Sequence, residues 1–156
     1  MKIMSIVIAA GFALLLSGCG PQDTRAGFLL GGVETPIPPD WHFTDETKEI
    51  AIQVHTPYLI PHAVTIWCAQ VDGQLYVAAN APQTKRWPGW VDNNPDVRLR
   101  IDDKVFMVRL VPLDDTNAIA GVRAAYAAKY QLDGRDGEAM PDVRYWHVTA
   151  RSDASA

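Results

Sequence analysis

The sequence predicts a mainly β domain, a small barrel of six strands with one or two short helices. The pair Asp72-Gly73 stands between two alternating apolar runs, and a two-residue hairpin loop favours such a pair because both positions need a positive φ. Asp102-Asp103 separates a second pair of runs in the same way. Only residues 114–130 combine helix-capping residues with apolar side chains at helical spacing. Consecutive hairpins with one inserted helix favour a closed barrel, since closure removes the edge strands.

Composition limits the chain to one ordinary globular domain. The chain has 156 residues, of which 48% are hydrophobic and 21% charged, values typical of a single soluble fold. The formal net charge is −4, and an acidic protein is a poor partner for phosphate backbones. We therefore expect no nucleic-acid binding.

Residues 1–19 predict a lipoprotein signal peptide. Lys2 precedes the apolar residues 3–16, and Leu16-Ser17-Gly18-Cys19 follows at the end of this run. The run is short for a membrane span and has the form of an export signal. Leu-Ser-Gly-Cys resembles the bacterial lipobox, which implies lipidation of Cys19 and a stable hold on a membrane through several acyl chains. The alternatives are an ordinary signal peptide with an incidental cysteine, or an uncleaved anchor.

The residues after Cys19 predict where the protein is held. Gly20, in place of Asp, resembles the sorting signal for the outer membrane of Gram-negative bacteria. We therefore expect localisation in the cell envelope, on the periplasmic face of that membrane. Residues 20–40 are rich in Gly and Pro and predict a tether, in which residues 28–30 form an apolar stretch able to dock on the domain. The signal has no twin arginine, so any cofactor would be acquired after export.

Residues 41–151 make up the predicted barrel domain, and residues 152–156 a polar tail. Six runs alternate in the manner of half-buried strands; they are residues 49–55, 62–71, 74–80, 97–101, 104–111 and 143–149. Residues 44–46 could form a single helical turn, and a short helix is expected near residues 87–93.

The two hairpin loops fix a register. In the first hairpin three pairs are expected: Val71 with Gln74, Ala69 with Tyr76, and Trp67 with Ala78. In the second hairpin Leu99 should face Phe106. One face of the first hairpin is then wholly apolar and reads as barrel interior: Val64, Ile66, Cys68, Leu75, Val77 and Ala79. A thiol on such a face behaves as a small hydrophobe, so we interpret Cys68 as structural.

The order of elements from residue 49 to residue 151 resembles the FMN-binding split β-barrel family. This family includes the pyridoxamine-phosphate oxidases and the deazaflavin-dependent nitroreductases. The similar residues are Trp67 and three short stretches, residues 72–77, 84–87 and 94–99. The resemblance implies a six-stranded split β-barrel with one or two short helices.

The resemblance also suggests a cofactor site. In flavin-binding members a Ser or Thr and a Lys after the third strand hold the cofactor phosphate, and Thr84 and Lys85 take that position here. Arg86 would add planar paired donors. Trp67, Trp87 and His62 would flank the flavin ring. The alternative for residues 84–86 is a solvated charged loop, and for the two tryptophans it is packing.

Two functions remain open. The first is an envelope-anchored oxidoreductase that uses FMN or deazaflavin; the second is a non-enzymatic lipoprotein whose barrel binds a ligand or serves assembly, with no cofactor. The chain has no phosphate-binding glycine loop, HExxH or CxxC motif, and its four histidines lie in separate segments, so no metal site is predicted. The face carrying Trp67 and Tyr76 is too apolar to face water, which favours a homodimer.

Overall fold

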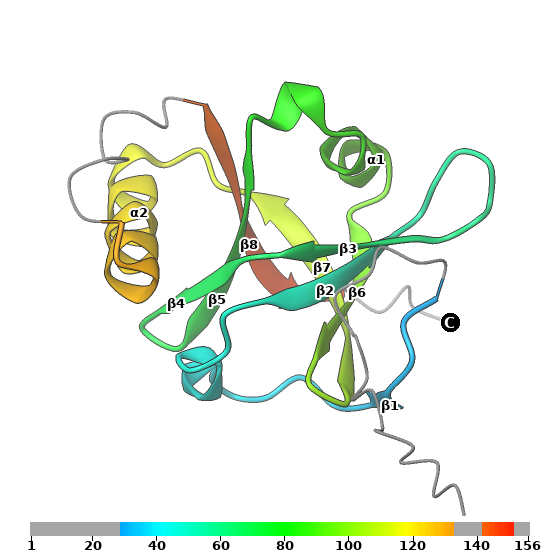
Figure 1. Ribbon diagram of the computed structural model, residues 1–156, viewed down its shortest axis with the longest axis horizontal. Helices are drawn as coiled ribbons and strands as arrows, with labels where there is room; N and C mark the ends of the chain where they lie inside the picture. The colour runs from blue at the N-terminus through cyan, green and yellow to red at the C-terminus, as the bar shows by residue number, and fades with distance from the viewer. Residues whose placement is uncertain (1–28, 133–141, 152–156) are drawn as a thin grey trace, which may run out of the picture.

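The computed structural model describes residues 29–132 and 142–151 (Figure 1). The predicted signal peptide with Cys19 and the polar tail lie outside these residues. Within the described residues there are two helices, α1 (Trp87–Asn93) and α2 (Thr116–Tyr130), and two 3-10 turns, η1 (His42–Thr44) and η2 (Pro82–Thr84). The strands are β1 (Val33–Glu34), β2 (Ile50–Val54), β3 (His62–Ile66), β4 (Cys68–Val71), β5 (Gln74–Asn80), β6 (Asp96–Ile101), β7 (Lys104–Pro112) and β8 (Val143–Ala150).

The strands form one curled sheet in the order β3-β2-β6-β7-β8-β5-β4. All pairs on this path are antiparallel, and β1 adds a short parallel pair beside β7. The two outer strands of the path, β3 and β4, are consecutive pieces of one chain segment that is interrupted only at Trp67. The sheet therefore curls back on itself through that segment. With β3 and β4 taken as one bent strand and β1 set apart, the predicted six-stranded split β-barrel is confirmed.

The predicted hairpin registers hold near the loops. Val71 pairs with Gln74 and Ala69 with Tyr76, and the loop between them has φ of 50° at Asp72 and 75° at Gly73. Leu99 pairs with Phe106 across the second loop.

The predicted pairing of Trp67 with Ala78 is wrong. The ladder between β4 and β5 ends at Cys68 and Val77. On the other side of Trp67, Ile66 pairs with Ile50 of β2 instead. The strand changes partner at this residue because its two halves must close opposite edges of the same sheet.

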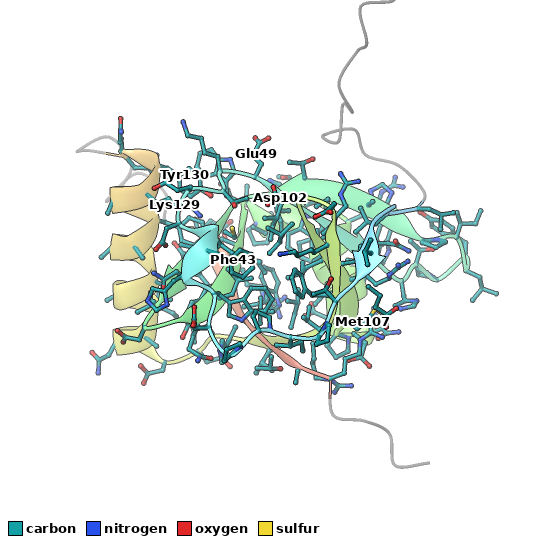
Figure 2. The ribbon with its side chains drawn as sticks, turned by 90° about the horizontal axis from the view of Figure 1, so that it is seen from below. Phe43, Glu49, Asp102, Met107, Lys129 and Tyr130 are labelled. Carbon is teal, nitrogen blue, oxygen red and sulfur yellow. The ribbon has the colours of Figure 1, made fainter. Side chains whose placement is uncertain are left out.

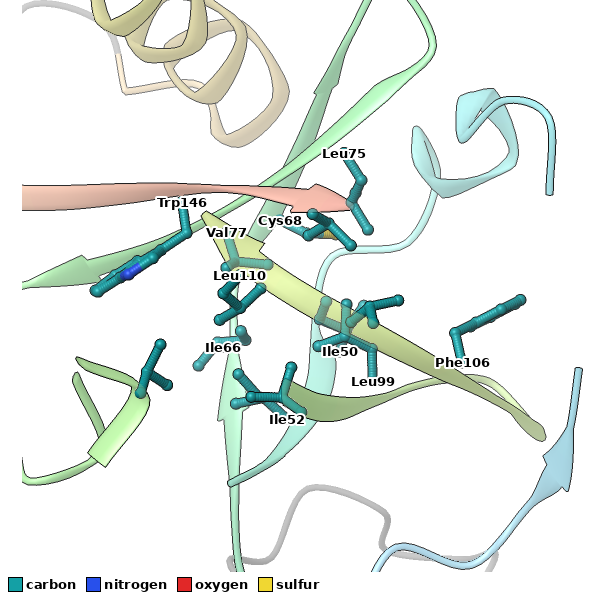
Figure 3. Close-up of a cluster of buried hydrophobic side chains, with 14 of the residues drawn as sticks. Ile50, Ile52, Ile66, Cys68, Leu75, Val77, Leu99, Phe106, Leu110 and Trp146 are labelled. Carbon is teal, nitrogen blue, oxygen red and sulfur yellow. The ribbon is translucent and has the colours of Figure 1, made fainter. Parts of the chain in front are cut away.

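The interior of the barrel is packed with the apolar faces of both hairpins (Figure 3). Cys68, Leu75, Val77 and Leu99 are fully buried there, and Trp146 of β8 fills one end. Burial also raises the pKa of the Cys68 thiol. The interpretation of Cys68 as part of the core is therefore supported by its surroundings.

Helix α2 covers the outer face of β4 and β5 (Figure 1). Asp115 caps it by accepting a hydrogen bond from the backbone N–H of Ala118 at 2.7 Å. Val122 and Tyr126 are buried against Ala69 of β4 and pack together with residues of β5 and β8. This helix covers much of the face that the sequence suggested would need a second subunit, although Trp67 keeps 42% of its surface exposed.

The described part of the predicted tether lies on the barrel. Leu30 is buried against Ala51 and Ala63, and its backbone N–H donates to the side-chain oxygen of Gln53 at 3.0 Å. Gly32 has φ of 130°, and a Cβ there would lie 2.7 Å from the Asp103 carbonyl oxygen, so only glycine fits this approach. The helical turn expected at residues 44–46 is a 3-10 turn that begins two residues earlier.

Candidate functional site

The barrel wall opens beside Trp67. The ladder of β4 and β5 stops at Val77, but β5 continues to Asn80 and there pairs only with β8. A cavity of about 610 Å³ lies at this opening. Its walls come from β3, β5, β8, α2, the start of α1 and the residues that connect these elements. They include Thr65, Ile66, Trp67, Ala78, Ala79, Asn80, Lys85, Trp87, Arg123, Tyr126, Ala127, Leu132, Val143 and Tyr145. A cavity of this size is suited to a cofactor or another small molecule.

The C-terminal half of α2 satisfies the backbone groups that the strand break leaves without a ladder. The Tyr130 hydroxyl accepts a hydrogen bond from the Cys68 N–H at 3.1 Å and donates to the Lys48 carbonyl oxygen at 2.6 Å. Lys129 Nζ donates to the carbonyl oxygens of Thr44 and Cys68, both at 2.8 Å. Figure 2 shows Lys129 and Tyr130 side by side at this end of the helix. Buried polar groups need such partners, so α2 fixes the bend that forms the cavity.

The hydroxyl groups at the bend are proton donors at neutral pH. Tyr126 donates to the Trp67 carbonyl oxygen at 3.1 Å. Burial raises the pKa of Tyr126 well above its ordinary value, and burial likewise raises the pKa of Tyr130. Neither group is therefore poised to accept a proton in a reaction.

Two tryptophans line the cavity from different sides. Trp67 stacks on Tyr130 with ring centroids 4.2 Å apart and planes 8° apart. Trp87, at the start of α1, is buried and lies 5.1 Å from the ring of Trp146 in the barrel interior. The cavity thus has both a partly exposed and a buried indole in its wall.

Two cations stand at the cavity on separate elements. Lys85 follows η2, and its ammonium donates to the Asn80 carbonyl oxygen. Arg123 of α2 is exposed, and within the described residues its guanidinium has no hydrogen-bond or ion-pair partner. Both positive charges therefore lie in the cavity wall, on the side of the protein where an anionic group of a ligand would meet them.

The other predicted site residues do not line the cavity. The Thr84 hydroxyl donates to the Ala81 carbonyl oxygen at 2.8 Å, and Arg86 is exposed at the cap position of α1. His62 lies against Trp90, with ring centroids 5.3 Å apart. The structure thus brings together Trp67, Lys85 and Trp87, but not Thr84, Arg86 and His62.

Sequence reasoning missed Arg123, Tyr126 and Tyr145 as cavity residues. The helical spacing of Val122 and Tyr126 did predict which face of α2 is buried, and Arg123 lies three residues before Tyr126 at the edge of that face. What the spacing could not predict is that the helix packs beside the strand break.

Within residues 29–132 and 142–151, no group of three His, Cys, Asp or Glu side chains could hold a metal ion. Over the same residues, no helix has the length and apolar character needed to cross a membrane.

Solved structures with a similar fold include proteins named for flavin and heme. The conserved hypothetical protein Rv2991 from Mycobacterium tuberculosis is 17% identical, with a TM-score of 0.58 over 70% of this chain and 76% of that one. HutZ, the heme storage protein from Vibrio cholerae, is 14% identical, with a TM-score of 0.55 over 69% of this chain and 84% of that one. A FAD-binding protein from Mesorhizobium loti is 14% identical, with a TM-score of 0.51 over 67% and 75%. At these identities the similarity shows the split-barrel fold alone.

No curated protein matches the sequence. A family model does match, over residues 43–151, and it is described as "Uncharacterized protein conserved in bacteria (DUF2255)". Since the match covers most of the chain, the protein belongs to the DUF2255 family, and in this chain the family domain is a split β-barrel.

Proposed function

We propose that this chain is a flavin-binding protein held in the cell envelope by a lipid on Cys19, and that bound FMN or deazaflavin makes it an oxidoreductase. One observation carries the proposal: a single cavity at the break in the barrel wall joins two indoles with two cations from separate elements. A flavin nucleotide has an aromatic ring system and a phosphate, so it needs both kinds of partner.

The residues present fit a flavin better than a heme. Among the described residues that line the cavity there is no His, Cys or Met to ligate iron. Tyrosine can also serve as a heme ligand, but of the two tyrosines in the cavity wall the Tyr126 hydroxyl is bonded to the backbone, and Tyr145 is buried with its ring packed against Tyr126. Fold similarity to a heme protein therefore contributes less to the proposal than the lining residues do.

The roles follow from the contacts. Lys85 and Arg123 would hold the phosphate, because charge-assisted hydrogen bonds to anions are the strong ones. Trp67 would stack on the ring system, and Trp87 would close the apolar end of the cavity. The cofactor supplies hydride transfer when bound, while the chain binds it, orients it and excludes water.

The experiment measures FMN and riboflavin affinity by flavin fluorescence. Lys85→Ala and Arg123→Ala should each weaken FMN binding by about tenfold or more, since a charge-assisted contact contributes roughly 1.5–3 kcal/mol. Riboflavin has no phosphate and should bind these variants and the parent protein alike. Trp67→Ala should weaken both ligands equally.

Arg86→Ala is the matched control, because Arg86 is an exposed cation beside Lys85 that does not line the cavity. An effect as large as that of Lys85→Ala would place the phosphate on the loop of Thr84, Lys85 and Arg86 instead. If the parent protein binds neither FMN nor a deazaflavin at concentrations on the order of tens of micromolar, the flavin proposal is wrong. The non-enzymatic module would then be the better description.

The lipid anchor has its own test. Cys19→Ser should abolish processing of the chain and shift its partitioning between detergent and aqueous phases. Cys68→Ala removes the other cysteine of the sequence and should leave both unchanged. Recovery of the processed protein with outer membranes supports the proposed periplasmic face; recovery with inner membranes contradicts that part alone.

A further inference from the structure

The loop between β2 and β3 carries an exposed apolar tip. Leu59 is 93% exposed, and its neighbours Tyr58 and Ile60 are about half exposed, at 54% and 48%. The other large apolar side chains exposed within the described ranges, apart from Leu29 and Val33, are single residues such as Phe43 and Val111. Single exposed apolar residues are ordinary, whereas a contiguous group indicates an interaction surface.

This tip is held in place by its own contacts. The Leu59 N–H donates to the Thr56 carbonyl oxygen at 3.2 Å, and the Thr56 hydroxyl donates to the Ile60 carbonyl oxygen at 2.6 Å. The Tyr58 ring lies edge-on against Trp90 of α1, with centroids 5.9 Å apart. The loop therefore presents its apolar side chains from a fixed backbone.

Leu59 occupies a conformation that leucine disfavours. Its φ is 63°, in the left-handed region where Gly and Asn are the usual residues. An exposed leucine adds little to the packing of the fold, and asparagine would adopt this left-handed backbone with less conformational strain. A backbone outlier of this kind points to a role outside the fold.

The surroundings of the tip match a lipid surface. Residues 55–62 contain no Asp, Glu, Lys or Arg, so insertion would bury no charge, and Tyr with apolar residues is the composition found at membrane interfaces. The described chain begins at Leu29, which is 73% exposed, and Leu30 packs on Ala63 just after the loop. Figure 1 shows the loop projecting away from the side that carries α2.

From these observations we infer that the tip formed by Tyr58, Leu59 and Ile60 inserts into the interfacial region of the bilayer that holds the protein. The inference rests on the proposed lipid anchor for its geometry. Cys19 is ten residues before Leu29, a span of at most about 33–36 Å, so an anchored domain could bring this loop to the membrane. The outcome would be a fixed orientation, with the loop on the lipid and α2 facing away from it.

The test places a fluorophore on the full-length chain in phosphatidylglycerol-containing vesicles and measures quenching by lipids with a nitroxide in the acyl chain. The labelled site is Ile60→Cys, and the control is Ala124→Cys on the exposed side of α2; Cys68 is buried and should not label. Quenching and a blue shift of emission are expected at residue 60 only. Equal quenching at both sites, or none at residue 60, overturns the inference.

Adding Leu59→Asn to the Ile60→Cys chain separates membrane contact from folding. Quenching should fall, while the melting temperature should stay the same or rise, because asparagine accepts the left-handed backbone. A lower melting temperature with unchanged quenching would mean that Leu59 serves the fold, and would overturn the inference.

A Cys19→Ser background, with vesicles in excess, distinguishes this inference from the anchor. Quenching at residue 60 that persists in this background supports a loop contact that does not need the anchor. If intact mass shows that the parent chain with Cys19 carries no lipid and residue 60 is still quenched, the anchor is wrong and the loop contact stands. A lipidated chain with no quenching at residue 60 supports the anchor and overturns the loop contact.

Discussion

At the scale of single residues, the bend at Trp67 gathers groups that titrate only at high pH. Burial raises the pKa of the Cys68 thiol above its ordinary value of 9.0, even though the nearby Lys129 lowers it. Burial also raises the pKa of the Tyr126 and Tyr130 hydroxyls above 10.0. All three groups are therefore neutral in the folded protein at physiological pH, and they serve as structural donors or as core.

These shifts predict a loss of stability in alkali. A group whose pKa is raised by folding keeps its proton where the unfolded chain has already lost it, so unfolding releases protons and the free energy of unfolding falls with rising pH. The stability should be complete below about pH 9 and fall above it, starting at the ordinary pKa of cysteine. Melting temperatures measured from neutral pH to about pH 11 check this, with Tyr130→Phe expected to make the decline shallower. A flat profile would contradict the burial of these groups.

At the scale of elements, α2 holds the strand break through its side chains. Tyr130→Phe removes the hydroxyl bonded to Cys68 N–H and Lys48 O. Leaving a buried backbone donor unsatisfied should cost roughly 1–3 kcal/mol in the free energy of unfolding, measured by urea denaturation. Tyr58→Phe is the matched control, because that side chain is exposed and should tolerate the change. Equal stability of the two variants would show that the bend does not depend on α2.

The start of α2 depends on one side chain. Asp115→Ala removes the oxygen that accepts from Ala118 N–H, and loss of a cap typically costs about 1 kcal/mol. Asp114→Ala removes a neighbouring exposed carboxylate that makes no such bond and should change the melting temperature far less. If the two variants have the same melting temperature, the Asp115 cap contributes little to stability.

At the scale of the whole molecule, the apolar surface that is left for a second subunit is smaller than the sequence suggested. Helix α2 covers most of the outer face of β4 and β5, but Trp67 remains 42% exposed beside the cavity. We expect a dimer through this region in light scattering of the full chain in detergent at micromolar concentration. Trp67→Ser should then give a monomer and Leu59→Ser should not. A monomeric parent protein would contradict the prediction and leave the cavity open to solvent on that side.

Features that depend on residues close together in the sequence were predictable, whereas features that depend on distant residues were not. The Asp72-Gly73 loop, the alternation along β5 and the Asp115 cap were predictable, because each depends on residues within a few positions of one another. Half of the predicted cofactor-site residues line the cavity: Trp67 at the strand break, Lys85 after η2 and Trp87 at the start of α1. Thr84 and Arg86 are neighbours of Lys85 in sequence, but the loop turns them away.

The sequence alone determined six strand segments, the two helices, their buried faces and the registers next to the tight loops, since side-chain period and turn chemistry are properties of short stretches. It did not predict β1, which lies in the stretch predicted as a tether. Tertiary structure alone decided that the strand breaks at Trp67 and that Arg123 lines the same cavity as Lys85. Judged from their own sequence, residues 62–71 could form one continuous strand paired with β5 along its whole length. They change partner because one edge of the curled sheet must meet β2 and the other must meet β5, and that requirement comes from all the strands together.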